Sequence, residues 1–180
     1  QFLMNLPAGM IQLTKTATVT YADNHYGIHG AAFKAGAGLV RLDGTLSQTG
    51  ASDLTVKGDL DFNAISEINP YIADSTRPIA VDLHIKGTTA SPELFGSATF
   101  HGETIAFRRG LGELDALVGT LRFSGHRAFT DQFLFNYNEA GVRLSGWVEL
   151  PCFVLSAADI KFKASELPMR LPQALSLSAD

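Results

Sequence analysis

The amino-acid sequence predicts an all-β fold: an elongated, curled, mostly antiparallel sheet with one short helix at most. Three observations lead to it. Apolar residues occupy every second position in about ten runs, so each run is a strand with one apolar face. Only short turns separate the runs, which favours antiparallel neighbours. Glycines inside the runs share the phase of the apolar residues: Gly30, Gly44, Gly58, Gly87, Gly96, Gly119 and Gly146.

The composition indicates an ordered, apolar chain. Of 180 residues, 46% are hydrophobic and 18% are charged, against roughly 25% charged in an average soluble domain. The net charge of −4 and the scattered Lys and Arg residues give no basic patch, so nucleic acid is not an expected partner. The single cysteine excludes an intrachain disulfide and a cysteine-based zinc site. We expect one β segment over residues 1–180, excised from a larger protein, because the chain begins at Gln1 and stops inside an alternating run.

The expected elements follow from these alternating runs. Residues 63–73 break the alternation and form the helix candidate, with Asn63 as a cap, three isoleucines on one side and Pro70 limiting its length. We expect a change of phase, produced by a bulge, between Ala157 and Ile160. The expected strands are residues 10–22, 26–32, 40–46, 54–62, 79–87, 94–100, 117–123, 129–137, 142–150 and 153–162, with a last one near Leu175.

The central stretch, residues 85–125, shows the rule most clearly. Leu94, Gly96, Ala98 and Phe100 form one row, and residues 117, 119, 121 and 123 form another. About ten apolar strand faces have one short helix as cover, so the sheet must close on itself, pack as two layers or keep a water-excluding groove. Glycines in the apolar phase leave room above the sheet and help it curl, and a long apolar surface suits an acyl chain. The alternative is a filled sandwich in which the glycines relieve crowding.

Several strings resemble a known family. Gly87, Thr88, Ser91, Pro92, Leu94 and Gly96 precede an alternating strand, and LDALVGTLRFSG, AGVRLSGWVEL and LVRLDGTLSQTGASDLTVKGDLDF continue the pattern over roughly residues 38–165. These strings resemble the TamB (translocation and assembly module) family, within the wider AsmA-like group of bacterial envelope proteins.

The resemblance implies a curled sheet, a β-taco, with a continuous hydrophobic groove. It implies a parent protein anchored in the inner membrane of a diderm bacterium and extending through the periplasm. The implied functions are phospholipid transport between the membranes and outer-membrane biogenesis, including protein secretion and assembly with an outer-membrane partner of the Omp85 class. The family has no catalytic residues or cofactor to transfer.

We expect the bulky apolar residues in phase with the glycines to contact phospholipid acyl chains. Arg143, on the opposite phase, is expected not to contact them. The expected groove residues are Leu42, Val56, Leu83, Leu94, Phe100, Phe107, Leu121, Phe123, Phe133, Phe135, Val142, Leu144, Val148 and Leu150.

No residue pattern argues for an enzyme, a cofactor or a metal. His25 and His29 share a strand face but have no third ligand close in sequence. Asp59 and Asp61 alternate with apolar residues, which favours a solvated strand face over a calcium loop. Ser91 and Ser145 lack a G-x-S-x-G context, and no phosphate-binding loop occurs.

Two further features are interpreted as surface groups. Arg108-Arg109 is expected in a solvated turn, or at the groove rim facing lipid headgroups. Trp147 lies opposite the Val142–Leu150 row and is a candidate contact with neighbouring chain or membrane.

The alternative function, of a different class, is a ligand-free structural β-sandwich or scaffold module of the cell envelope.

Overall fold

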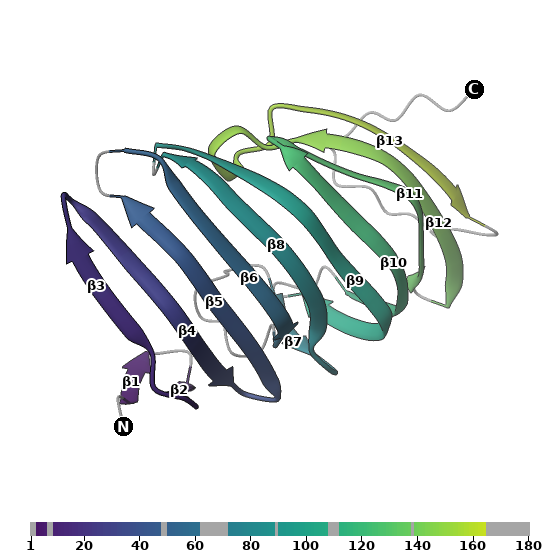
Figure 1. The fold of residues 1–180 in the computed structure, drawn as a ribbon. Helices are drawn as coiled ribbons and strands as arrows, with labels where there is room; N and C mark the ends of the chain where they lie inside the picture. Colours follow the sequence, from purple (N-terminus) through teal and green to yellow (C-terminus); the bar gives the residue numbers. More distant parts are fainter. Residues whose placement is uncertain are drawn as a thin grey trace.

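The structure, a computed structural model, describes residues 3–6, 9–47, 50–61, 72–88, 90–107, 112–137 and 139–164. Over these residues the chain forms a single open, curled antiparallel sheet, which confirms the predicted all-β class (Figure 1). The strand order is β1-β2-β4-β5-β6-β8-β9-β10-β11-β12-β13, with β3 paired to β4 and β7 paired to β9. The only helical element described is a single 3-10 turn, η2, at Pro151–Phe153.

The strand bounds are as follows. They are β1 Leu3–Leu6, β2 Gly9–Leu13, β3 Thr18–Ala22, β4 His25–Ala35, β5 Gly38–Ser47, β6 Ser52–Leu60, β7 Ile72–Ser75, β8 Ile79–Thr88, β9 Ser91–Phe107, β10 Glu113–Gly125, β11 Arg127–Tyr137, β12 Ala140–Glu149 and β13 Ala157–Ala164.

Two predicted strands are wrong in their extent. Residues 10–22 form two strands, because the backbone N–H and the side-chain hydroxyl of Thr14 both donate to the carbonyl of Ala32 at 2.7 and 3.0 Å and end the pairing of β2. Beyond this break β3 pairs with the other half of β4. Residues 153–156 are not a strand either, since η2 ends at Phe153 and β13 begins at Ala157. The helix candidate lies outside the described residues except for Ile72 and Ala73, which begin β7, and the strand near Leu175 lies outside them entirely.

A bulge in β11 changes the face of one predicted row. Thr130 pairs with Gly146 and Phe133 pairs with Leu144, with a register shift between them. Phe129 pairs with Trp147 and therefore lies on the polar face, whereas Phe133 lies on the apolar face. Regular alternation over the predicted strand 129–137 places Phe129 and Phe133 on the same face. This prediction is wrong, because a bulge adds a residue and reverses the alternation.

The sheet bends at a corner built from β7, β9 and β10. Gly102 has no partner between His101, which faces Val118, and Glu103, which faces Leu117. On β10 the register shifts at the same level, and Ala116 has a positive φ of 50°. Figure 1 shows the end of β9 beside β7 bending out of the plane of the neighbouring strands. We call the part of β9 from Gly102 onwards, the part of β10 up to Leu117, and β7 the corner.

The main hydrophobic core lies at this corner. Ile79 and Leu117 are 1% and 3% exposed, and the rings of Phe100 and Phe133 meet edge to face at 5.0 Å. Leu60, Leu83, Ala98, Phe107, Leu114, Leu121, Phe135 and Leu144 pack around the buried residues. We call these residues the corner cluster; its buried members are Ile79, Val81, Phe100, Ile105, Leu117 and Phe133.

The in-phase glycines have a backbone role. Gly96 has a φ of 106°, and a Cβ placed on it would lie 2.1 Å from the carbonyl oxygen of Asp82 on the adjacent strand. Gly146 repeats the arrangement, with a φ of 133° and the carbonyl oxygen of Asp159 at 2.0 Å. A side chain there would strike the neighbouring backbone, so the glycines permit close approach and bending of strands. We expected these glycines to leave room above the apolar face. At Gly96 and Gly146 the close approach of the neighbouring backbone explains the glycine instead.

Candidate functional site

The candidate site is the apolar face of the sheet. Residues that the strand register pairs across neighbouring strands form rows on this face. One row, which we call the long row, continues across eight strands. It runs through Leu42, Val56, Leu83, Gly96, Phe123, Ala128, Val148 and Ala158. Successive side chains in a strand alternate faces, so cross-strand partners such as these lie on one face.

The remaining predicted groove residues belong to neighbouring rows on the same face. Phe100, Phe133 and Leu144 lie in one row, in register through Gly119. The other pairings are Leu94 with Ile85, Leu121 with Ala98, and Phe135 with Val142. Phe107 reaches the face through the corner cluster, and Leu150 follows Val148 in the same phase. The structure thus brings the fourteen predicted residues to one face.

The two parts of this face differ in burial. Phe100 and Phe133 are 6% and 7% exposed, and five half-buried side chains pack against the buried cluster: Leu83, Phe107, Leu121, Phe135 and Leu144. The residues outside the corner cluster are, with one exception, only half-buried: Leu42, Val56, Leu94, Phe123, Val148 and Leu150; the exception is Val142, at 5%. The face is therefore covered most at the buried residues of the corner cluster. We call the half-buried residues of the face outside that cluster the open half.

A small apolar pocket lies at the edge of the open half. Its volume is about 60 Å³, and its lining includes Leu94, Phe123 and Leu150 from three different strands or their ends. His126, in the β10–β11 turn, also lines it, and its Nδ1 is buried without a hydrogen-bond partner. A lone buried polar atom in an apolar pocket is a point where a ligand or water with a hydrogen-bonding group gains an interaction.

Polar contacts hold the corner in place. Glu103 is 1% exposed, and its carboxylate accepts a hydrogen bond from the backbone N–H of His101 at 2.6 Å across the unpaired Gly102. The backbone of Thr104 exchanges hydrogen bonds with Thr76 beside β7, and the Thr104 hydroxyl donates to Asp115 on β10. These contacts join three strands at the bend. The alternation did not predict these contacts. Glu103 lies on the apolar face in the structure because Gly102 before it has no partner on β10.

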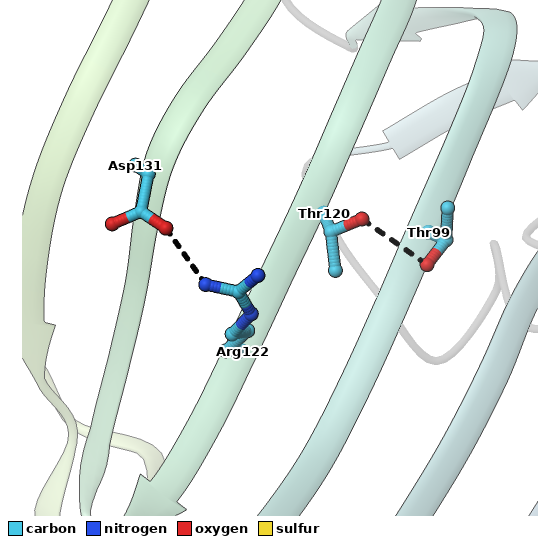
Figure 2. A network of polar contacts seen from close by, with 4 residues as sticks. All are labelled: Thr99, Thr120, Arg122 and Asp131. Atoms are coloured by element: carbon cyan, nitrogen blue, oxygen red, sulfur yellow. Dashed lines mark hydrogen bonds and ion pairs between the residues drawn. The ribbon is translucent and has the colours of Figure 1, made fainter.

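The opposite face carries cross-strand polar pairs. Arg122 donates to Asp131 at 2.7 Å, and Thr99 and Thr120 share a hydrogen bond at 3.3 Å (Figure 2). Lys57 pairs with Asp82 at 3.1 Å. Such exposed pairs fix which face meets water but contribute little stability individually.

One pair on the polar face lowers the pKa of a carboxyl group. The ring of His84 hydrogen-bonds to the exposed carboxylate of Asp53, and this hydrogen bond, aided by the positive charges of His84 and Lys86, lowers the pKa of Asp53. The pair joins β6 and β8, because Asp53 and His84 lie diagonally opposite in the register.

Trp147 is held within the polar face. The guanidinium of Arg127 lies 4.4 Å from the centre of its ring, and Arg127 also pairs with Glu149 at 2.9 Å. Trp147 and Phe129 line an open hollow of about 800 Å³, whose lining also includes Asp131, Asp159 and Lys161. Charges of both signs line this hollow, so it does not suit an acyl chain.

The remaining candidate residues gain no chemical role. No group of three His, Cys, Asp or Glu side chains arranged for a metal occurs in the described ranges. Asp59 is exposed as expected, but Asp61 is 5% exposed and accepts the backbone N–H of Ala37 at 2.8 Å, so its assignment to a solvated face is wrong. Arg108 and Arg109 lie outside the described residues.

Comparison with known proteins gives no match: no family model, no curated protein and no solved structure matches this chain. Within the part of the chain that the structure describes, no helix has both the length and the apolar character needed to cross a membrane.

Proposed function

We propose that this chain is a segment of a periplasm-spanning protein of a diderm bacterium, whose apolar sheet face forms a groove that carries phospholipid acyl chains between the inner and outer membranes. The observation that supports it is the long row, an apolar line across eight strands whose bulky side chains Leu42, Val56, Phe123 and Val148 are half-buried. Acyl chains gain free energy from such a surface without directed hydrogen bonds. Through its full-length parent, anchored in the inner membrane, the same face would support outer-membrane protein assembly with an Omp85-class partner.

Photo-crosslinking tests this function directly. A photoreactive amino acid is placed at Val56, Phe123 or Val148 on the open half, and the chain is incubated with a labelled phospholipid. We expect lipid adducts at these three positions and none at Arg41 or Arg143, whose side chains are exposed on the opposite face. Equal capture on both faces, or capture on neither, contradicts the proposal.

A charged substitution separates carriage from folding. Leu144 packs against the corner cluster, so Leu144→Arg buries an unpaired charge and unfolds part of the core. Val56 lies on the open half, and we expect Val56→Arg to keep the fold while reducing lipid capture at Phe123. The matched control is Thr55→Arg, one residue away on the opposite face.

The second candidate function is a ligand-free scaffold module of the envelope. The corner cluster favours it, because there the apolar face is already covered by the chain itself. Native mass spectrometry after mild extraction distinguishes the two: bound lipid supports carriage, and a lipid-free chain that takes up no detergent supports the scaffold.

A further inference from the structure

The connection between β12 and β13 exposes apolar side chains in a way that differs from the rest of the described chain. Val154 and Leu155 are consecutive and are 66% and 62% exposed. Other exposed apolar residues, such as Leu39 and Val118, lie within strands. From Leu150 to Ala158 the sequence contains no charged residue. This uncharged connection, residues 150–156, is called the apolar loop below.

The apolar loop is fixed to the sheet. At one end the backbone N–H of Leu150 donates to the carbonyl of His126 at 2.7 Å, and the N–H of Ser156 donates to Glu149 at 2.9 Å. In between, the Cys152 thiol donates to the carbonyl of Ala90 at 3.0 Å, in the β8–β9 turn. Cys152 has a left-handed φ of 51°, a conformation that costs a non-glycine residue free energy and persists where surrounding contacts hold it. The exposed pair is thus presented by a fixed framework.

The loop is continuous with the candidate site. Leu150 is both its first residue and a lining residue of the small apolar pocket, together with Leu94 and Phe123 of the apolar face. The apolar loop therefore adjoins the apolar face at this pocket. Arg127, which lines the same pocket, is already paired with Glu149.

We propose that the apolar loop docks on a lipid bilayer by inserting Val154 and Leu155 into its interfacial region. Insertion removes their apolar surface from water, and the uncharged sequence carries no charge into the lipid. Because the loop itself carries no charge, we expect docking not to require anionic lipid. The role of this contact, as the place where lipid reaches the apolar face, rests on the proposed function. The membrane contact itself can be tested separately.

Vesicle flotation tests the proposal with the 180-residue chain. Vesicles of phosphatidylcholine, and of phosphatidylcholine with phosphatidylglycerol, are floated with the wild-type chain and with the double variant Val154→Asp/Leu155→Asp. We expect both vesicle types to bind the wild-type chain equally. The partition coefficient of the double variant onto vesicles should be lower by roughly tenfold or more. The control is Val19→Asp on β3, where the wild-type side chain is 63% exposed; its partition should stay within about twofold of wild type. Circular dichroism melts check that each variant folds.

Each other outcome has a defined meaning. Unchanged flotation of the double variant, or an equal loss in Val19→Asp, overturns the proposal. Flotation only with phosphatidylglycerol that disappears in salt indicates electrostatic adsorption and also overturns it. Self-association that sedimentation shows in the wild type and not in the double variant, without vesicle binding, identifies a second copy as the occupant. Crosslinking of detergent-dispersed phospholipid at Val56 tests the groove separately: it should be retained in the double variant, and its absence from the wild type would count against the groove alone.

Discussion

The corner and the open half of the apolar face are made from the same alternating pattern, yet different forces hold them. At the corner, Ile79 and Leu117 are nearly fully buried and the sheet covers itself. On the open half, Val56 and Phe123 remain half-buried, and the strands approach one another through glycines such as Gly96. Side-chain packing therefore covers the corner, whereas on the open half glycines bring the strands together and the apolar surface stays partly exposed. A face that carries lipid needs this division, since a fully packed face has no apolar surface left to offer.

The largest difference should come from removing one phenylalanine from each region. Phe133→Ala empties a site in the corner cluster and removes its edge-to-face contact with Phe100. We expect a loss of about 3–5 kcal/mol in the free energy of unfolding, measured by denaturant titration. Phe123→Ala, on the half-buried long row, should cost about half as much or less. Equal losses would show that the open half is packed as tightly as the corner.

A glycine substitution tests the backbone account of the open half. Gly96→Ala forces a side chain into a positive φ and against the backbone of Asp82. We expect it to destabilise the chain by about 1–3 kcal/mol. Gly141→Ala is the matched control, because Gly141 also lies in a strand and its nearest neighbour would be Asn136 Oδ1 at 3.8 Å. If thermal melts show the two variants equally stable, the glycines are not what permits the strands to bend.

A smaller effect is expected from the buried acid at the corner. Glu103→Ala leaves the His101 backbone N–H without its acceptor beside the unpaired Gly102. The expected loss is about 1–2 kcal/mol, and Glu103→Gln, which keeps an acceptor, should lose less. Hydrogen exchange of the corner amides measures the effect locally. Faster exchange on the open half alone would show that Glu103 does not hold the bend.

The sequence was sufficient for the fold class and for the face on which the candidate residues lie. Alternation is local, so it places Leu42, Leu83 and Val148 on the same kind of strand face without any knowledge of their partners. The prediction from alternation failed where a single residue interrupts the strand pairing. The bulge after Thr130 moved Phe129 to the polar face, and Thr14 divided the predicted strand 10–22.

The corner and the apolar loop were beyond the reach of the pattern. Alternation does not say which part of an apolar face will be covered, because covering depends on contacts between β7, β9 and β10 that are distant along the chain. Glu103 and Asp61 were missed because both are acids whose burial depends on a particular backbone N–H. The uncharged run after Glu149 was visible in the sequence, but the η2 turn that interrupts it required the structure.

The smallest effect should come from the polar face. The His84 hydrogen bond lowers the pKa of Asp53, so the folded state holds this carboxylate deprotonated more strongly than the unfolded chain does. Its contribution to stability is therefore present above the carboxyl's ordinary pKa and is lost as the pH falls through the lowered value. We expect the stability difference between the wild-type chain and Asp53→Asn, measured by melts across acidic pH, to shrink as the pH falls below about 4. Because the pair is exposed, the whole effect should be weaker than any at the corner and should diminish in high salt. A difference that grew at low pH would show that Asp53 is stabilised in the unfolded chain instead, and that the polar face does not contribute to holding β6 against β8.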